Sequence, residues 1–244
     1  MKRPEEKPPA LYQTGRQEHR ATGLAAAAGL AVALAWLPSC HPAKPAFSPL
    51  PPRVTSIEGH ASLRLVRNGE TARSRLSFLF LLPERGQIEV HDPVGRRAAR
   101  LFLIEDQACL VLPSKRAYWQ GGREEALGKL LGFDLRPEEM IDILQGRGDR
   151  MAGWAVERDS RQRVLRGRRD GLHFEVRRFF GETGVPQLLM FFRNGEAGSL
   201  RILRLQFNQP LKKGVLDLSF LKNGDYRACP WDEMESLMRD KDEN

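Results

Sequence analysis

The sequence predicts a mainly β fold with a helical insert: a strongly curved antiparallel half-barrel of about 10 to 11 strands, closed by a two-helix lid. Two observations predict it. Apolar residues alternate along most of the chain after Val54, and turn residues separate the alternating segments. Residues 109–144 interrupt this pattern with two short amphipathic segments that follow a Gly-Gly pair. A sheet of this size twists and curls, so we expect the two helices to cover its hollow face.

The composition is that of a folded protein with a basic surface. The chain has 244 residues, of which 41% are hydrophobic and 29% are charged, and its net charge is +8. These proportions exclude an intrinsically disordered chain. The positive charge indicates an anionic partner, such as phospholipid, lipopolysaccharide or nucleic acid, although a solvated arginine-rich surface also accounts for it.

The N-terminus has the parts of a secretory signal in their usual order. Residues 1–20 hold five lysines and arginines, residues 21–36 carry no charge, and Leu37-Pro38-Ser39 precedes Cys40. This arrangement resembles the bacterial lipobox, so we predict a lipoprotein signal peptide at 1–39 and acylation of Cys40. The alternatives are a transmembrane anchor and an ordinary signal peptide, but the apolar run is short for a bilayer core of about 30 Å.

Residues 40–53 are predicted to form a lipidated, proline-rich tether. Five prolines fall within the twelve residues 41–52. Such a segment is stiff and extended and has no fold of its own. The tether would hold the half-barrel domain, predicted at 54–209, close to a membrane.

The first half of the domain is predicted to be a meander of strands joined by tight turns. Asn68-Gly69 is a hairpin signal, and Asp92-Pro93-Val94-Gly95 is a later turn. The predicted strands are Ser56–Arg67, 74–82, 87–91, 98–105 and 108–113. Large apolar residues of this half are expected to line the cavity under the helices, namely Leu76, Phe78, Phe80 and Phe102.

The interruption predicts two lid helices. Arg123–Leu131 suits the first, with Gly132 placed to end it, and Pro137 suits the first position of the second, which ends before Gly146. Neither helix is long enough to be stable alone, so both must dock on the sheet. They cover either a hydrophobic cavity or an ordinary solid core. The residues expected on their docked faces are Leu127, Leu130, Leu131, Met140, Ile141 and Leu144.

Strands return after the helices and lead into a C-terminal extension at 210–244. Asp170-Gly171 and Asn194-Gly195 are hairpin turns. Within the extension, residues 212–220 suit one further strand and Trp231–Arg239 suits a short helix. The predicted strands of this half are 154–158, 162–167, Leu172–Phe179, 187–193 and 200–208.

Enzymatic chemistry is not indicated. The sequence has no nucleophile elbow, no phosphate-binding loop and no metal-ligand spacing, so we predict no catalytic residue, no metal and no cofactor. Nucleic acid is disfavoured as a partner by the export signal. Cys109 and Cys229 would both lie in an oxidising compartment, where they form either a disulfide or two buried thiols.

Three segments of the chain match a known family. They are Asp92-Pro93-Val94-Gly95 with the apolar strand after it, residues 125–132 with the second helix, and residues 174–177 leading through Pro186 to 200–208. In these segments the chain resembles the LolA/LolB family, in particular the LolB-like outer-membrane lipoprotein receptors. The resemblance implies a monomer whose hydrophobic cavity binds the acyl chains of lipidated cargo received from a periplasmic LolA-like carrier. It also implies insertion of that cargo at the periplasmic face of the outer membrane, where the chain would be anchored.

The resemblance also assigns Pro93, Val94 and Gly95 to a membrane-insertion loop, with Val94 in place of the family's leucine. Arginines beside this loop and in a second turn are expected to contact anionic lipid, although the second group also suits a charged strand edge. These arginines are Arg96, Arg97, Arg161 and Arg163.

A function of a different class remains open. The chain would then be a structural envelope lipoprotein that serves as a scaffold for a protein partner or lipopolysaccharide, without lipid transfer. An open apolar volume under the helices favours transfer. A core filled by large side chains favours the scaffold, and the residues that would fill it are Phe78, Phe80, Phe102 and Leu103.

Overall fold

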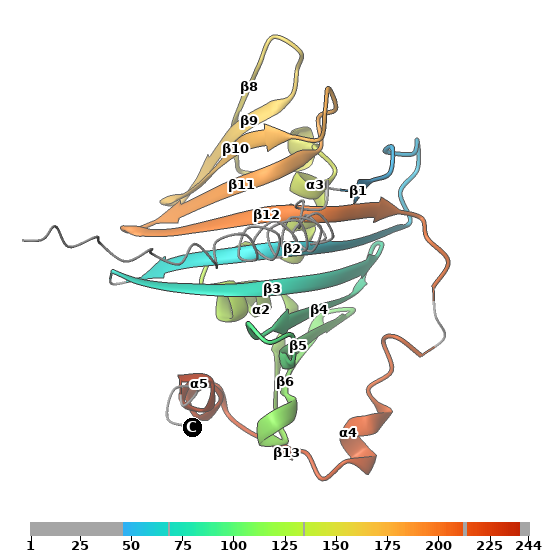
Figure 1. The fold of residues 1–244 in the computed structure, drawn as a ribbon, viewed down its shortest axis with the longest axis vertical. Coiled ribbons are helices and arrows are strands. Elements are labelled where there is room, and N and C mark those ends of the chain that lie inside the picture. Colours follow the sequence, from blue (N-terminus) through green and yellow to red (C-terminus); the bar gives the residue numbers. More distant parts are fainter. Residues whose placement is uncertain (1–45, 68, 134, 212–213, 240–244) are drawn as a thin grey trace, which may run out of the picture. The chain divides into compact units, whose positions relative to one another are not determined.

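The computed structural model describes residues 46–67, 69–133, 135–211 and 214–239, and Lys44–Asn244 forms one compact unit (Figure 1). Within the described residues, thirteen strands form one curved sheet that does not close. This confirms the predicted mainly β half-barrel, and eleven of the strands, β2 to β12, have four residues or more. The predicted signal peptide and its acylation site Cys40 lie outside the described residues.

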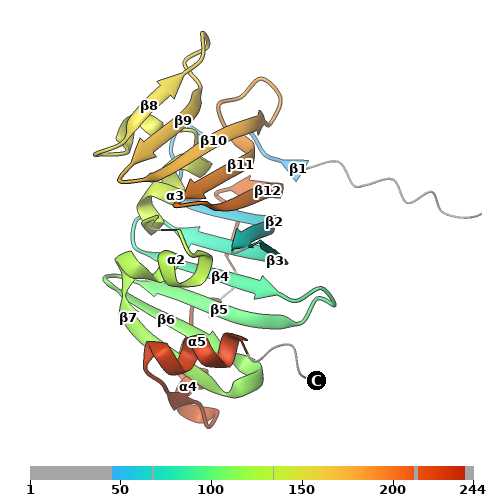
Figure 2. The ribbon, with the colours of Figure 1, turned by 90° about the vertical axis from the view of Figure 1, so that its left-hand side faces the viewer.

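Two meanders make up the sheet, and they join where β2 pairs with β12 (Figure 2). The order across the sheet is β13-β7-β6-β5-β4-β3-β2-β12-β11-β10-β9-β8, with β1 added beside β12. The strands are β1 (Ala46–Phe47), β2 (Ser56–Arg67), β3 (Glu70–Leu81), β4 (Arg85–His91), β5 (Arg97–Ile104), β6 (Gln107–Leu112), β7 (Ala117–Gly122), β8 (Ala155–Arg158), β9 (Val164–Arg169), β10 (Leu172–Phe179), β11 (Pro186–Arg193), β12 (Glu196–Phe207) and β13 (Arg227–Ala228).

Helices are few and short. The helices are α2 (Arg123–Leu131), α3 (Pro137–Leu144), α4 (Ser219–Asn223) and α5 (Trp231–Arg239), with single 3₁₀ turns at Pro113–Lys115 and Gly148–Arg150. In the part of the chain that the structure describes, no helix has both the length and the apolar character needed to cross a bilayer.

Strand alternation gives the sheet an inner face, toward α2 and α3, and an outer face. On β2 and β3, residues such as Ile57, Leu63, Leu76 and Phe80 are buried on the inner face, while those between them point outward. The ring of Phe78 also lies on the inner face, where it occupies the space that a side chain at position 59 would need. The main core therefore lies between the inner face and the helices.

Phe102 does not face the lid as predicted. Leu101 and Leu103 belong to the inner core, so alternation places Phe102 on the outer face, where it packs with Cys109 and Val111. The prediction was wrong because β5 is apolar on both faces, and an alternation pattern cannot tell such faces apart. A second, smaller core therefore lies on the outer side of β5 and β6.

The C-terminal extension supplies the cover for this second core and is part of the same compact unit. Phe220 of α4 packs on Phe102 with 5.9 Å between ring centroids, β13 then pairs with the edge strand β7, and α5 packs on the inner side. The predicted strand at 212–220 was wrong. Residues 214–217 form a turn and Ser219–Asn223 a helix, because this segment covers the outer face instead of pairing along an edge. The predicted helix Trp231–Arg239 is present as α5.

The predicted tether is shorter than 40–53, since its second part belongs to the fold. Ala46 and Phe47 pair with Arg204 and Leu205 of β12, and the Phe47 ring stacks on Phe180 at 4.7 Å. Burial of this aromatic ring explains why the chain is held here despite the nearby prolines.

Cys109 and Cys229 are free, buried thiols. Cys109 lies in the outer core and Cys229 in the inner core, so the sheet separates them. Burial raises the pKa of the Cys109 thiol to about 12. Of the two alternatives left open by the sequence, the structure contains two thiols and no disulfide between these residues.

Candidate functional site

The candidate site is the interface between the inner face and the lid, which we define as residues 123–144: α2, a linker and α3. Leu127 and Leu131 of α2 are buried, as are Met140, Ile141 and Leu144 of α3, whereas Leu130 is partly buried. Leu76, Phe78 and Phe80 lie across from them on the inner face. The structure thus brings nine of the ten predicted lid and cavity residues together and leaves out Phe102.

The linker of the lid is as deeply buried as its helices. Phe133 stacks on Phe191 at 5.6 Å and covers Gly198, where a Cβ atom would lie 2.5 Å from the Phe133 ring. Leu135 is buried beside it. Sequence reasoning missed both residues because a linker has no helical period, although two large apolar residues between helices are a usable signal.

Arg123 fastens the start of the lid to the rim of the sheet. This side chain is 7% exposed, and its Nε donates to Oε1 of Glu138 at 2.7 Å. Its other nitrogens donate to the carbonyl oxygens of Pro83, Glu84 and Glu105, which lie in the turns after β3 and β5. One buried guanidinium therefore joins both lid helices to two turns of the sheet.

Arg67, at the end of β2, fastens the end of α2. Its Nη2 donates to the carbonyl oxygen of Leu131 at 2.9 Å, and its Nε lies 3.5 Å from Oε2 of Glu196. Gly132 makes this contact possible because a Cβ atom there would lie 1.0 Å from Nη2 of Arg67, and its φ is +77°. Gly132, which ends the helix, thus also leaves space for the Arg67 side chain that caps it.

Glu139 fastens α3 from inside. Its carboxylate is 3% exposed and accepts hydrogen bonds from the Arg136 backbone N–H at 2.9 Å and from the Trp154 indole N–H at 3.0 Å. The guanidinium groups of Arg136 and Arg169 also donate to it. Burial by itself raises the pKa of this carboxyl, but these hydrogen bonds and the charge of Arg169 outweigh burial and lower it.

A third helix, α5, packs beside the lid, and the sequence did not predict this contact. The Lys129 ammonium of α2 lies 4.4 Å from the ring centroid of Trp231 on α5 and 5.2 Å from that of Trp119 on β7. The two indole rings are themselves 5.6 Å apart, nearly perpendicular to each other. The contact lies between distant parts of the chain, so no local pattern could indicate it.

Large side chains fill the space between the lid and the inner face. Beneath α3 there is a crevice of about 10 Å³, which is large enough for about one water molecule. It is lined by Ile143, Met151, Phe174 and Val176. The larger hollows lie outside this interface instead. One of about 580 Å³ lies beside the start of α2, and its acidic lining comprises Glu84, Glu105, Asp106, Glu124, Glu125 and Glu138.

The predicted membrane-insertion loop is a tight, exposed turn between β4 and β5. Val94 is 76% exposed and Gly95 has a φ of +87°. Asp92 closes the turn by accepting hydrogen bonds at 2.8 Å from both the backbone N–H and Nε of Arg96. The side-chain hydrogen bond from Arg96 lowers the pKa of Asp92. The turn therefore presents Val94 to solvent on a rigid frame that includes Pro93.

The four arginines expected to contact lipid all have acidic partners. Arg96 and Arg97 pair with Asp92 and Glu89 beside the Val94 turn. Arg163 pairs with Asp159 at 2.7 Å and Arg161 with Glu182. Register places these last two arginines at the opposite end of the sheet from Val94. The four therefore do not form one surface. The described residues also contain no group of three or more His, Cys, Asp or Glu arranged to hold a metal ion.

The chain matches no protein-family model and no curated protein, but its fold is found among solved structures. It is similar to an outer membrane lipoprotein-sorting protein domain from Vibrio parahaemolyticus, with a TM-score of 0.51 and 12% identity over 68% of this chain and 91% of that chain. A LolA superfamily protein from Nitrosomonas europaea gives a TM-score of 0.48 and 10% identity over 70% and 94%. The MucA/MucB complex of Pseudomonas aeruginosa gives 0.34 and 16% over 66% and 55%.

Proposed function

We propose that this chain, whose fold is that of outer membrane lipoprotein-sorting domains, is an envelope lipoprotein that binds acyl chains of lipidated cargo between its lid and its inner face. It would then help to insert the cargo into the outer membrane. One observation carries the proposal: the lid buries apolar side chains along its whole length, whereas charged residues fasten it at separate points that include Arg67, Arg123 and Glu139. A lid built in this way can separate from the sheet as a unit.

The energetics of exchange support this proposal. Moving the lid away exposes several buried side chains, each worth about 1.5–3 kcal/mol. An acyl chain of about 15 methylene groups gains about 12 kcal/mol when it is buried. One bound chain therefore offsets the exposure of about four to eight such side chains, which is a large part of the contacts that the lid makes with the inner face. The filled interface is then the ligand-free state, in which the lid's own leucines occupy the place of the acyl chain.

Delivery would use the two features that lie outside the lid. Acylation of Cys40 would keep the domain at the membrane, and the Val94 turn would touch the bilayer during release. The cargo would arrive from a periplasmic LolA-like carrier. No covalent step is required of the protein, because burial of the acyl chain in the bilayer drives release.

Acyl-chain binding can be tested with purified Lys44–Asn244 and cis-parinaric acid, a fatty acid that fluoresces in apolar surroundings. Saturable fluorescence is expected, and palmitate should displace the probe. Mass spectrometry of the full chain purified from bacterial envelopes should find lipid or acylated protein bound to it. Lipid-free protein that gives no saturable fluorescence would overturn the transfer function.

Replacing Arg67 by alanine is expected to speed probe uptake about fivefold, because the end of α2 loses a partly exposed, charge-assisted hydrogen bond worth about 1 kcal/mol. Stopped-flow fluorescence with cis-parinaric acid measures the rate. Arg64→Ala is the matched control, since Arg64 lies on the same strand but on the outer face. Equal rates for the two variants would show that Arg67 does not hold the lid closed.

Replacing Val94 by glutamate is expected to lower delivery of a fluorescent lipopeptide to phospholipid vesicles by about tenfold, because burial of the valine contributes about 1–2 kcal/mol. The melting temperature should not change, since the side chain is 76% exposed. Val94→Leu is the control and should deliver at least as fast as the parent. Unchanged delivery by the glutamate variant would remove this turn from the mechanism.

The scaffold function is the second candidate, and the filled inner face favours it. If the lid is a permanent part of the core, the protein presents a solid domain to a protein partner or to lipopolysaccharide. The two functions differ in the fatty-acid experiment. A scaffold gives no saturable uptake, even for Arg67→Ala, and still folds cooperatively.

A further inference from the structure

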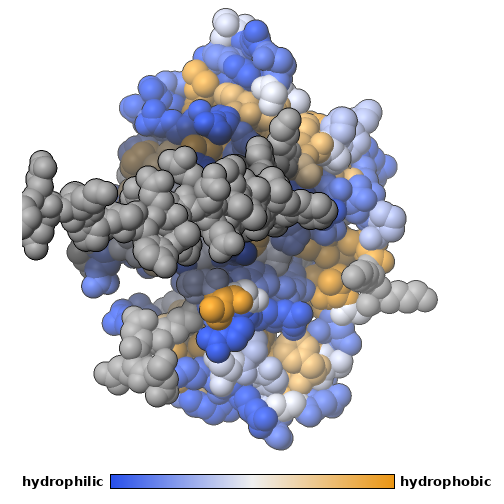
Figure 3. Space-filling view, in the orientation of Figure 1, coloured by the Kyte–Doolittle hydropathy of each residue, from blue (hydrophilic) through white to orange (hydrophobic). Residues whose placement is uncertain are grey.

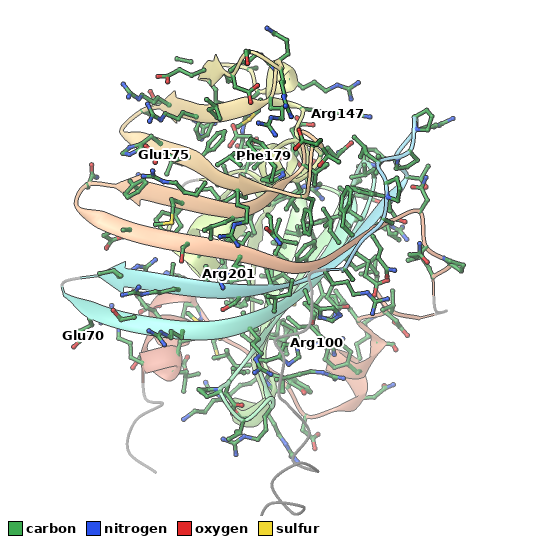
Figure 4. The ribbon with its side chains drawn as sticks, turned by 45° about the horizontal axis from the view of Figure 1, so that its top comes forward. Glu70, Arg100, Arg147, Glu175, Phe179 and Arg201 are labelled. Atoms are coloured by element: carbon green, nitrogen blue, oxygen red, sulfur yellow. The ribbon has the colours of Figure 1, made fainter. Side chains whose placement is uncertain are left out.

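Five exposed arginines on the outer face of the three central strands form no ion pair with any described residue. We call them the arginine crest, and all five are exposed: Arg64 on β2, Arg73 and Arg75 on β3, and Arg201 and Arg204 on β12. Figure 4 shows Arg201 on the outer side of β12, and Figure 3 views the outer face, which around the grey atoms is mostly hydrophilic (blue) with some apolar patches (orange). None of these five arginines is among the site residues predicted from the sequence.

Strand register brings the five side chains together. Arg75 and Arg201 both pair with Ser62, one from each neighbouring strand, so they lie in one row across the sheet. Arg64 and Arg73 are direct partners in the next row. Arg204 pairs with His60, four residues before Arg64 on the same strand. With strands about 4.8 Å apart and residues about 3.4 Å apart, the crest covers about 10 Å across the strands and about 14 Å along them.

Within the described part of the chain, no crest arginine forms an ion pair, and Arg204 donates only to the uncharged amide of Gln206. Some arginines farther out on the sheet differ, because Arg166 of β9 and Arg177 of β10 both pair with Glu175. Like charges directly opposite on neighbouring strands, as at Arg64 and Arg73, are destabilising. The central strands thus maintain a concentration of positive charge that costs stability and that no ion pair with a described residue neutralises.

We propose that the arginine crest binds the phosphate groups of an anionic phospholipid bilayer, so that the outer face of the sheet lies against the membrane. Guanidinium groups bind phosphate oxygens in a bidentate manner, and arginine is less strongly hydrated than lysine. A curved outer face meets a flat surface along its central strands, which is where the crest lies. A bilayer is therefore the occupant that this geometry fits.

Two further features also place the outer face of the sheet toward the membrane. The turn with Val94 follows His91, the partner of Arg75, so it lies at the same end of the sheet as Arg64 and Arg73. Ala46, which pairs with Arg204, comes six residue steps after Cys40, so an acylated Cys40 would hold the crest within about 20 Å of the bilayer. This second point rests on the proposed lipid anchor, whereas the crest itself does not. The acidic hollow beside α2 lies at the other end, away from the anionic surface.

The crest can be tested by sedimentation with vesicles of phosphatidylcholine and phosphatidylglycerol (70:30), using Lys44–Asn244, which forms a compact unit with its own core. The variant R64Q/R73Q/R75Q/R201Q should bind at least 20-fold more weakly, since each arginine near such a surface contributes about fivefold. The matched control R161Q/R168Q/R227Q/R239Q loses the same charge from exposed, ion-paired arginines and should lose less than threefold. Binding of the parent should disappear in 0.5 M NaCl and on neutral vesicles.

Several outcomes would overturn the crest. Equal binding by the crest variant and the parent would do so, as would an equal loss in the control, which would assign binding to net charge alone. If the parent does not bind anionic vesicles but binds immobilised polyglutamate or lipopolysaccharide, the ligand of the crest is an acidic macromolecule and not a bilayer. The corresponding Arg→Lys variant, which keeps the charge, should retain binding within about fivefold. Uptake of cis-parinaric acid should be the same in all variants, so a failure of the crest is distinguishable from a failure of acyl-chain binding.

Discussion

Replacing Glu139 by alanine is expected to lower the free energy of unfolding by about 3 kcal/mol, because a buried carboxylate that several donors share is lost. Arg136, Trp154 and Arg169 all donate to this one group. Urea unfolding followed by circular dichroism measures the change at pH 7. Glu124→Ala is the control, since Glu124 is an exposed glutamate in the first turn of α2, and it should change stability by less than about 0.5 kcal/mol.

The same site predicts how stability depends on pH. The pKa of Glu139 is lower in the folded protein than the value of about 4.3 in the unfolded chain. Its contribution is therefore complete above about pH 5 and is lost as the pH falls below about 4, through the folded pKa. The difference in urea unfolding midpoint between the parent and Glu139→Gln should therefore become smaller as the pH is lowered from about 5 to below about 4. A difference that stays constant from pH 7 to pH 3 would contradict the proposed role of the ionised carboxylate.

Replacing Leu127 by alanine is expected to lower the free energy of unfolding by about 3 kcal/mol, because the substitution removes a fully buried side chain and leaves a cavity. Leu127 is 0% exposed and lies at the centre of α2 against the sheet. Urea unfolding should show a lower midpoint with an unchanged dependence on denaturant.

Leu130→Ala provides the matched control, since Leu130 lies on the same helix and is only partly buried. Its cost should stay below about 1.5 kcal/mol. If the lid opens as a unit, Leu127→Ala should also take up cis-parinaric acid faster than the control, because the closed state has lost contacts that the open state never made. A loss of less than about 1 kcal/mol for Leu127→Ala would mean that the lid is loosely packed on the inner face.

The elements that the sequence predicts best have signals within their own residues. Arg123–Leu131 begins after a Gly-Gly pair and ends at Gly132, and Leu172–Phe179 follows an Asp-Gly turn, and both coincide with the observed α2 and β10. The curved sheet also follows from local patterns, because a sheet of many strands joined mostly by short turns twists and curls instead of staying flat. Fold class, turn positions and the docked faces of the lid were accessible for this reason.

The errors occur where a residue's role depends on distant parts of the chain. Phe102 has the same alternation as its neighbours, and only the arrival of Phe220 from the C-terminus makes the outer side of β5 a core. The segment 212–220 has strand-like composition, but the available edge of the sheet is occupied by β13 instead. Such choices are decided by which surfaces remain uncovered once the sheet has formed.

The lid shows the same division. Its two helices and their apolar stripes were determined by the sequence itself, because a period near 3.6 residues and helix-ending glycines act over a few residues. Only the tertiary structure decided how the lid is closed and what it covers. Among 39 lysines and arginines, nothing local distinguishes Arg67 and Arg123, which fasten the lid, from the exposed arginines of the crest. Burial and ion pairing of a charge depend on the partners that folding brings within reach, and those partners lie far away along the chain.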